Sequence, residues 1–163
     1  MAGPGTLPRL FVVAVGDKLP AWAGAACDEY LKRLPRGFEA TLVEVRAEAR
    51  TSGKSVPQMM AAEAARLRVA LPRGSRLVGL DERGKDFTTA QFSAKVRGWL
   101  DSGVPTSFLI GGPDGLDASL KRECELLLRL SSFTLPHALA RAVFAEQLYR
   151  AASVLTGHPY HRE

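Results

Sequence analysis

The side chains with the clearest chemical potential stand at the C-terminal end of the sequence, where Tyr160, His161 and Arg162 follow one another. An aromatic ring can stack on a nucleobase, an imidazole can accept or relay a proton near neutral pH, and a guanidinium can bind an anion. His158 and His161 also form an H-x-x-H spacing. A zinc site needs three or four ligands, and Pro159 breaks the helix that would place both rings on one face. We therefore expect no metal, and solvated tail histidines are the simpler interpretation of that spacing.

Two segments upstream have the composition of a ligand-binding edge. The apolar run 106–110 ends in Gly-Gly-Pro-Asp-Gly at 111–115, and the segment Leu-Ser-Ser-Phe-Thr-Leu at 130–135 is followed by Pro136. A buried strand that stops in glycine brings backbone amides to the carboxyl edge of a sheet, where open α/β proteins bind ligands. The first loop lacks the G-x-G-x-x-G spacing of a dinucleotide site, and a tight turn stiffened by proline is the alternative. Together the loops suit a flat, adenine-bearing ligand of low charge better than a polyphosphate.

The segment Thr-Ser-Gly-Lys-Ser at 51–55 resembles the end of a phosphate-binding P-loop. A complete motif requires a glycine five positions before Gly53, where this sequence has Glu48. A carboxylate at that position repels phosphate, and no clean strand-loop context precedes the segment. The sequence therefore argues against a nucleoside triphosphate as the ligand.

Short apolar runs alternate with amphipathic stretches along the chain. This pattern predicts strands at residues 10–15, 38–45, 77–80, 106–110 and 130–133. It predicts helices at 20–34, 55–71, 88–100, 117–127 and 136–156, the last ending at Gly157. Residues 81–86 are expected to form a charged turn that closes the third strand. Helical crossovers of this length imply α/β architecture with a mainly parallel sheet and flanking helices, in one domain spanning residues 1–163 with residues 1–8 disordered.

The helices also indicate which of their faces are buried. Apolar stripes run through Trp22, Ala26, Tyr30 and Leu34, then through Met60, Ala64, Leu67 and Leu71, and then through Phe92, Val96, Trp99 and Leu100. Capping boxes open two of these helices, Ser55 with Gln58 and Thr88 with Gln91. The last helix is apolar on more than one side, which predicts burial in the core or against a second subunit. Arg141, Glu146 and Arg150 are embedded in it, and either an ion-pair network or a functional site would explain them.

Composition narrows the class of protein. A formal net charge of +5 and a pI near 9.6 favour a polyanionic partner, and Arg46, Arg50 and Lys54 are spaced along one predicted mobile loop. No apolar run approaches the ~20 residues of a membrane span. Cys27 and Cys124 are far apart in helix-like sequence, and we expect small buried residues of a reducing compartment. These features predict a cytoplasmic protein without membrane contact.

Four motifs, taken in order, resemble one known family. They are Leu-Ile-Gly-Gly-Pro-Asp-Gly at 109–115, Thr-Leu-Pro-His at 134–137, Glu-Gln-Leu-Tyr-Arg-Ala at 146–151 and His-Pro-Tyr-His-Arg-Glu at 158–163. Their types and order closely resemble the RlmH-type rRNA methyltransferases of the SPOUT superfamily. Segments 13–18 and 29–33 also fit, so the resemblance extends over essentially the whole sequence from about Arg9.

The resemblance implies an α/β fold with a C-terminal trefoil knot, working as a homodimer. It implies S-adenosylmethionine as methyl donor, S-adenosylhomocysteine as product, no metal, and N3 of a pseudouridine in 23S rRNA of the ribosome as acceptor. Carried onto this sequence, the cofactor residues are Leu80, Gly112, Leu130, Ser131, Ser132, Phe133, Thr134 and Leu135. The residues matching the family's target site are His137, Arg150, Tyr160 and His161.

A mechanism follows as a hypothesis from this resemblance. Methyl transfer from a sulfonium is an in-line displacement, so positioning should supply most of the acceleration. The proton on N3 must leave, and we expect His161 to accept or relay it while Arg150 or Arg162 stabilises charge on the base. The cations of the predicted mobile loop would contact rRNA phosphates. Two alternatives stay open: a catalytically inactive rRNA- or ribosome-binding module of the same fold, and a nucleotide-using hydrolase or kinase, against which Glu48 argues.

Overall fold

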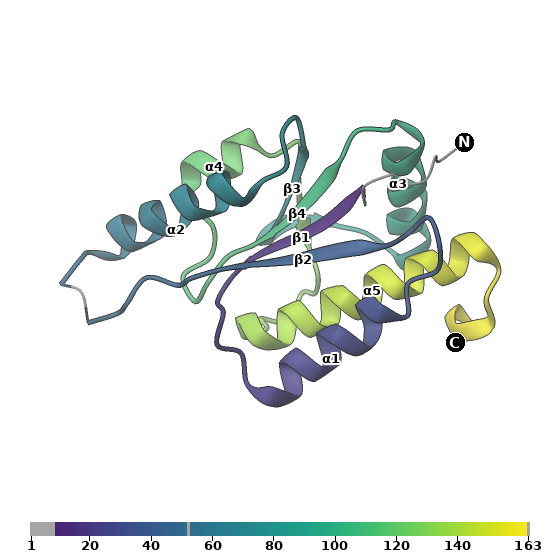
Figure 1. Cartoon of the computed structure of the whole chain (residues 1–163), viewed down its shortest axis with the longest axis horizontal. Helices are drawn as coiled ribbons and strands as arrows, with labels where there is room; N and C mark the ends of the chain where they lie inside the picture. Colours follow the sequence, from purple (N-terminus) through teal and green to yellow (C-terminus); the bar gives the residue numbers. More distant parts are fainter. Residues whose placement is uncertain (1–8, 52, 163) are drawn as a thin grey trace.

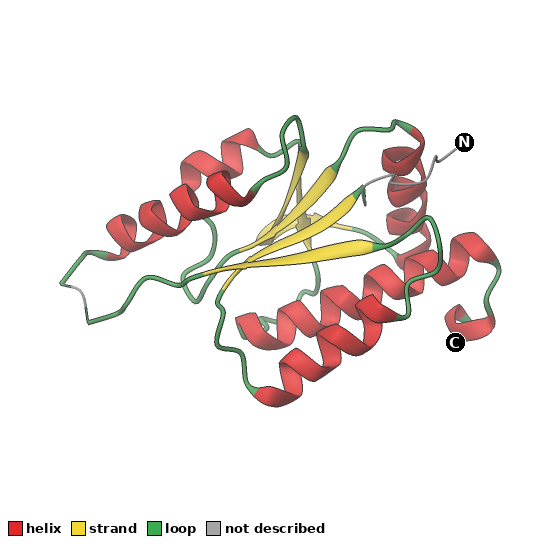
Figure 2. Ribbon diagram, in the orientation of Figure 1, coloured by secondary structure: helices red, strands yellow, loops and turns green. Residues whose placement is uncertain are grey.

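Five parallel strands form one sheet in the order β2-β1-β4-β3-β5 (Figures 1 and 2). The computed structural model describes residues 9–51 and 53–162, so the prediction for residues 1–8 lies outside the described residues. The strands are β1 Leu10–Val15, β2 Ala40–Val45, β3 Arg76–Asp86, β4 Thr106–Ile110 and β5 Leu126–Arg129. The predicted α/β architecture with a parallel sheet is confirmed.

The helices cover the two faces of the sheet unequally. On one face lie α1 Ala21–Lys32, α3 Thr89–Asp101 and α5 His137–Thr156, and on the other α2 Val56–Ala70 and α4 Ala118–Glu123 (Figure 1). After α5 the chain makes one 3₁₀ turn, η1 Pro159–His161, which packs back on α5. Helices on both faces explain why the central strands are apolar on both sides.

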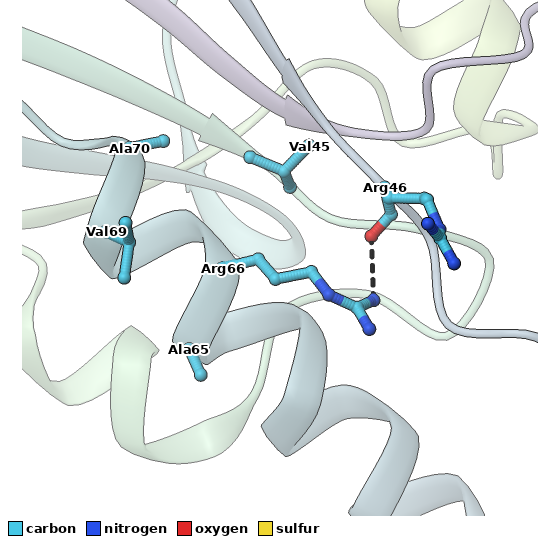
Figure 3. A pocket seen from close by; sticks show the side chains of 6 residues that line it. All are labelled: Val45, Arg46, Ala65, Arg66, Val69 and Ala70. Atoms are coloured by element: carbon cyan, nitrogen blue, oxygen red, sulfur yellow. Dashed lines mark hydrogen bonds between the residues drawn. The ribbon is translucent and has the colours of Figure 1, made fainter.

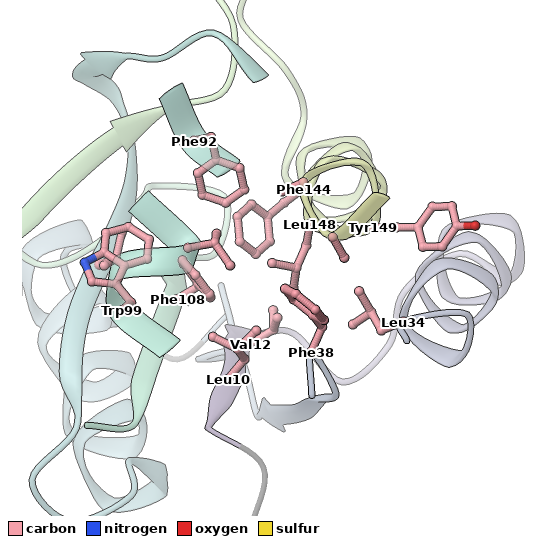
Figure 4. Close-up of a cluster of buried hydrophobic side chains, with 14 of the residues drawn as sticks. Leu10, Val12, Leu34, Phe38, Phe92, Trp99, Phe108, Phe144, Leu148 and Tyr149 are labelled. Carbon is pink, nitrogen blue, oxygen red and sulfur yellow. The ribbon is translucent and has the colours of Figure 1, made fainter. Parts of the chain in front are cut away.

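Alternate residues of the central strands supply two separate cores. Leu10 and Val12 of β1 pack among the helices α1, α3 and α5, whereas Val13 and Val15 point to the α2 and α4 face. The larger core is rich in aromatic rings, with Phe108 of β4 4.9 Å from Phe144 of α5 between ring centroids (Figure 4). This packing fixes α5 against the middle of the sheet. It therefore also fixes the positions of the loop before α5 and of η1 after it.

The predicted helix boundaries are confirmed where the sequence carries capping chemistry. Ser55 and Thr88 each accept a hydrogen bond from the backbone N–H of Gln58 and Gln91, and both capping boxes are complete. Pro136 precedes α5, and Gly157 ends it in the left-handed conformation at φ 73°.

The charged segment 81–86 does not end the third strand, contrary to the prediction. β3 continues through a bulge between Leu80 and Lys85 and then pairs again with β5. Gly84 makes this possible, because a Cβ there would lie 2.7 Å from the carbonyl carbon of Leu128. Asp86 is held by Arg129 of β5, which lowers the pKa of that carboxyl group.

The fifth strand was predicted at residues 130–133, and this is also wrong. α4 ends at Glu123, and residues 126–129 form β5 because their backbone pairs with β3 from Val78 onward. The three successive leucines at 126–128 fitted a helix stripe equally well by periodicity. Residues 130–136 are consequently a loop outside the sheet.

Two predicted helix stripes differ from the structure at their first residue, whereas Leu34 of the first stripe and Ala64 and Leu67 of the second are buried as predicted. Trp22 is 56% exposed, whereas Ala23 and Cys27 are buried, because α1 packs closely on Ala142 and Ala145 of α5. In α2, likewise, Met59 is buried and Met60 only partly so. The stripe predicted for α3 is confirmed in full, with all four of its residues buried.

Both cysteines are free thiols, as predicted from their spacing. Cys27 is buried and Cys124 is half-buried, and burial raises the pKa of both thiols, that of Cys124 to about 11. Of the helices within the described residues, none has both the length and the hydropathy needed to cross a membrane.

Candidate functional site

The three segments predicted to bind the cofactor meet at one edge of the sheet. Leu80 lies opposite Leu128 of β5, and Gly79 lies opposite Leu109 of β4. The loop 111–115 leaves β4 just beyond that register, and the loop 130–136 leaves β5. We call these two segments the cofactor loops. Because the three strands are parallel and adjacent, Leu80 at the bulge of β3 lies on the same side of the sheet as Gly112 after β4 and Leu130 after β5, as expected for a ligand site.

The loop 111–115 is shaped by close backbone contact. Gly112 and Gly115 form an antiparallel bridge, and the Gly115 N–H donates to the Gly112 carbonyl at 3.0 Å. A Cβ on Gly111 would lie 2.5 Å from the carbonyl carbon of Gly115, so only glycine fits there. Gly112 is packed on Val15, whose Cγ1 would lie 3.1 Å from an added Cβ.

The loop 130–136 turns its side chains outward. Leu130 packs against the large core, Ser132 and Thr134 are exposed, and Leu135 is half-buried. Phe133 is 82% exposed, and its N–H donates to the Ser131 hydroxyl at 2.9 Å. The backbone of this loop lies outside the sheet ladder, so it can serve a ligand at the sheet edge.

The C-terminal turn forms an aromatic and ionic cluster on α5. The Tyr160 hydroxyl donates to Glu146 at 3.0 Å, and Arg150 forms an ion pair with the same carboxylate at 2.7 Å. The Tyr160 ring lies edge-on to Tyr149 with centroids 4.6 Å apart, and the Arg33 guanidinium lies 5.9 Å from its centroid. Burial, and then hydrogen bonds with Tyr30 and Glu146, raise the pKa of Tyr160. Tyr160 is therefore a protonated, engaged side chain.

Arg141 and Arg150, two of the charged residues embedded in α5, differ in how deeply they are buried. Arg141 is 1% exposed, pairs with Glu44 at 2.5 Å and donates to the carbonyls of Val15 and Gly16 at 3.0 and 2.9 Å. Arg150 pairs with Glu146 but is only half-buried. The ion-pair interpretation therefore holds for Arg141, which ties α5 to the end of β1, while Arg150 combines an ion pair with access to the surface.

The tail and the cofactor loops lie at opposite ends of the sheet within one chain. His137 opens α5 next to the loop 130–136, and Arg150 lies ~20 Å further along the helix at its ordinary rise per residue. Figure 1 shows η1 beside the start of the strands, at the far end of α5 from the loops. The structure thus brings Arg150 and Tyr160 together, and leaves His137 with the loops.

The remaining tail residues differ in exposure. His161 is half-buried, and its Nδ1 is buried without a hydrogen-bond partner among the described residues. Arg162 is exposed. Within residues 9–51 and 53–162, no group of three or more His, Cys, Asp or Glu side chains is arranged to hold a metal ion.

Large apolar side chains are exposed around the cofactor loops. Trp22 stands in the first turn of α1, Leu139 in the first turn of α5, and Phe133 in the loop before it, at 56%, 36% and 82% exposure. Since α1 and α5 lie side by side and both begin at the carboxyl edge of the sheet, these residues share one end of the molecule (Figure 1). We call them the apolar rim.

Two of the three cations of the loop after β2 form ion pairs within the chain, and their expected contacts with rRNA phosphates stay a prediction. Lys54 pairs with Glu48 at 2.8 Å, and Arg66 of α2 pairs with the other oxygen at 2.6 Å. These two hydrogen bonds lower the pKa of Glu48. Arg50 binds Asp114 at 2.7 Å. Arg46 is exposed and has no ion-pair partner within the part of the chain that is described.

A shallow, aliphatic surface hollow of about 460 Å³ lies between β2 and α2 (Figure 3). It is lined by Val45, Arg46, Ala65, Arg66, Val69 and Ala70, none of which was predicted to bind the cofactor or the target base. Arg66 crosses it to donate to the Arg46 carbonyl at 2.9 Å. No residue of the cofactor loops lines this hollow.

Sequence reasoning missed one residue of this region, Glu63 of α2. It is 2% exposed, and its carboxylate oxygens lie 3.4 and 3.5 Å from the place of a Cβ on Gly112. In the sequence it stands between pairs of alanines, as Ala-Ala-Glu-Ala-Ala at 61–65. A lone carboxylate among small apolar residues on the inward side of a helix was the signal available.

Comparisons with known proteins show which proteins this chain is similar to. A "Ribosomal RNA large subunit methyltransferase H" from Bordetella pertussis (strain Tohama I) is 54% identical over 154 residues, 94% of this chain and 99% of that protein. A protein of the same name from Burkholderia cenocepacia is 49% identical over the same shares.

A crystal structure of a probable methyltransferase from Bordetella pertussis Tohama I has the same fold, with a TM-score of 0.58 at 18% identity over 89% of this chain and 95% of that one. The profile of the family described as "Predicted SPOUT methyltransferase" matches residues 9–161. That match spans the sheet, both cofactor loops and the tail turn. On these grounds the chain belongs to the SPOUT methyltransferase family.

Proposed function

We propose that this protein transfers a methyl group from S-adenosylmethionine to N3 of a pseudouridine in 23S rRNA, as a homodimer. The observation that carries the proposal is the relative named "Ribosomal RNA large subunit methyltransferase H", 54% identical and matched over nearly its whole length. The target within the rRNA comes from the motif resemblance at 134–137, 146–151 and 158–163.

The cofactor loops fit this donor chemically. Glycine at 111 and 112 lets a ligand approach the backbone where a Cβ would otherwise stand, and the loop 130–135 adds backbone groups and the half-buried Leu135. Leu80 and Leu130 supply an apolar floor. Such a lining suits an adenosine better than a polyphosphate. When bound, the sulfonium supplies an electrophilic methyl group, and the residues of this chain orient it.

Separation of the tail from the loops supports the homodimer. A side chain ~20 Å away along α5 cannot act on a methyl group held by its own chain's loops. A second copy packed on the apolar rim would bring its own tail to those loops. Exposed Trp22, Phe133 and Leu139 are the kind of large apolar residues that such an interface buries.

In this proposal, residues of the tail remove the proton from N3 of the base. The Tyr160 hydroxyl is engaged by Glu146, so Tyr160 holds the turn in place. His161 would accept the N3 proton of the base, through Nε2 because Nδ1 is buried. Arg162, which is exposed, or Arg150 would stabilise the charge that develops on the base.

The wider setting follows from the same target. A pI near 9.6 favours an RNA partner, and exposed Arg46 is a candidate phosphate contact. We further propose a cytoplasmic location, where ribosomes are found, and the C-terminal trefoil knot that the family resemblance implies.

The proposal is tested by incubating purified protein and S-adenosylmethionine with ribosomes from cells that lack this activity. Mass spectrometry of 23S rRNA fragments should show one added methyl group on a pseudouridine, and protein-free 23S rRNA compared with intact ribosomes identifies the accepted form. A catalytically inactive rRNA-binding module would bind ribosomes without adding mass. Calorimetry with S-adenosylmethionine then distinguishes an enzyme lacking its substrate from a protein with no cofactor site.

A further inference from the structure

Glu63 is a buried carboxylate that is only partly satisfied. Its Oε2 accepts the backbone N–H of Glu48 at 3.0 Å, and its Oε1 is buried without a hydrogen-bond partner among the described residues. The side chain is 2% exposed. Burying a carboxylate is unfavourable unless its oxygens are paired, so a group of this kind calls for a reason other than stability.

The Glu63 carboxylate lies against the first cofactor loop, 111–115. Both oxygens of Glu63 stand 3.4 to 3.5 Å from the position a Cβ would take on Gly112, so the carboxylate faces the backbone of that glycine. Gly112 in turn forms the bridge with Gly115. The unpaired oxygen is therefore beside the part of the loop that the donor would contact.

Arg50 connects this carboxylate to the other side of the loop. Its Nη2 lies 3.6 Å from Glu63 Oε2, and its Nη1 lies 2.7 Å from Asp114 Oδ2. The same nitrogen donates to the sulfur of Met59 at 3.3 Å. Arg50 thus lies between a carboxylate of α2 and a carboxylate of the loop, and its charge is used inside the molecule.

We propose that Glu63 is a positioning residue for the loop 111–115 and that Arg50 is its bridge to Asp114. Glu63 holds the start of the loop after β2 through the Glu48 N–H and orients Arg50, and Arg50 fixes Asp114. The loop is then held in one conformation before a ligand arrives, which lowers the cost of binding. The identity of that ligand rests on the proposed function, whereas the positioning role does not.

A merely structural role predicts a different result from Glu63→Gln. The amide keeps the size of the side chain and one acceptor for the Glu48 N–H, but it removes the charge that orients Arg50. Replacing a poorly paired buried charge by a neutral group of similar volume is often neutral or stabilising. A positioning role therefore predicts unchanged or higher thermal stability together with weaker ligand binding.

The experiment measures S-adenosylhomocysteine binding by calorimetry and amide hydrogen exchange of the peptide covering 108–116. We expect Glu63→Gln and Arg50→Gln each to weaken binding roughly tenfold, as for other groups that orient a binding residue, and to speed exchange in that peptide. The double variant should be no worse than the stronger single variant, because both act through one chain of contacts. Glu123→Gln is the control, since it breaks the exposed Arg68 pair on α4.

The two proposals fail in different ways. If the unaltered protein shows no binding of S-adenosylhomocysteine, the proposed cofactor is wrong, and hydrogen exchange without ligand still tests the positioning role. If the unaltered protein binds but Glu63→Gln binds equally well with unchanged exchange, the positioning role is wrong. If Glu63→Gln lost binding and its melting temperature also fell, the positioning role would be overturned as well, because a general packing defect would then explain the loss of binding.

Discussion

The two ends of the sheet are built in opposite ways. At the carboxyl end, the cofactor loops present glycine, small polar residues and backbone, and the loop 111–115 is so close-packed that a Cβ on Gly111 has no room. At the amino end, the tail turn presents side chains, with Tyr160 held by Glu146 and packed on Tyr149. The proposed function assigns ligand binding to the backbone of the first end, while the second end carries charged and titratable side chains.

This difference is the basis for the proposal that the site is completed by a second chain. The proposed cofactor loops offer few side chains that can move a proton, whereas the tail carries His161 and Arg162. The helix α5 joins the two ends and keeps them ~20 Å apart from His137 to Arg150. Two chains in opposite orientation would place each kind of end against the other, and the predictions below test that arrangement.

The largest effect is expected for Gly111→Ala at the carboxyl end. The new Cβ would lie 2.5 Å from the Gly115 carbonyl carbon, and backbone cannot yield as a side chain can. We expect a loss of roughly 1–3 kcal/mol of stability by overpacking, and no detectable methylation. Thermal unfolding and the rRNA methylation assay measure the two. Gly98→Ala is the control, because its added Cβ would meet no described atom within 4 Å beyond its chain neighbours and the backbone of its own helix, and it should be at least as stable as the unaltered protein.

The second prediction asks whether the two ends act across chains. Gly112→Ala crowds Val15 at 3.1 Å and should impair the loop, and His161→Ala removes the proposed base, so each variant alone should lose roughly 100-fold or more in rate. A refolded equal mixture should recover about a quarter of full activity, since half the dimers are mixed and each has one intact loop beside one intact tail. A mixture no more active than its parents would mean that each tail serves its own chain.

The two ends of the sheet also differ in how much of their structure can be predicted from the sequence alone. Glycine spacing and capping residues report local backbone geometry, so the strand 106–110, both capping boxes and the site edge could be predicted. The path of β3 could not, because Gly84 matters only once Leu128 lies beside it. Glu63 was missed for the same reason: its importance depends on Gly112, which is distant in sequence.

For the tail, too, the sequence alone could not predict how the residues are placed in space. Its residue types indicated proton transfer and anion binding, but their distance from the loops depends on the packing of α5 against the aromatic core. Trp22 was assigned to the wrong face because Ala23 and Cys27 fit against α5 and an indole does not. Periodicity identified the rest of this stripe correctly, since Ala26 and Tyr30 pack against the same cluster and Leu34 is buried.

A smaller effect is expected for Arg46→Ala, which removes an exposed cation at the carboxyl end of β2. Since this arginine has no ion-pair partner among the described residues, its charge is available to phosphate. Ribosome binding should weaken severalfold, and the slope of log affinity against log salt should fall by about 1. Lys54→Gln is the comparison, because that charge is already used by Glu48 and the slope should change less. Equal slopes for both variants would contradict the assignment of Arg46.

The smallest effect concerns Tyr160 and alkaline pH. Its pKa is raised in the folded protein, first by burial, so the native state holds the phenolic proton more tightly than the unfolded chain, whose pKa is about 10. The stability from this group is therefore complete below pH 10 and is lost as the pH rises further. Tyr160→Phe should cost about 0.5–1.5 kcal/mol at pH 8 through the lost bond to Glu146, and less above pH 10.

Thermal unfolding between pH 8 and pH 11 measures whether the stabilities of Tyr160→Phe and the unaltered protein converge as the pH rises. Tyr149→Phe is the control, since that residue contributes its ring rather than its hydroxyl to the cluster and should shift the curve in parallel. If Tyr160→Phe also shifted the curve in parallel, its hydroxyl would not be the group that titrates. Because a phenol held this firmly keeps its proton at neutral pH, Tyr160→Phe should also leave the pH dependence of methylation unchanged, which separates the anchor of the tail from the proposed base.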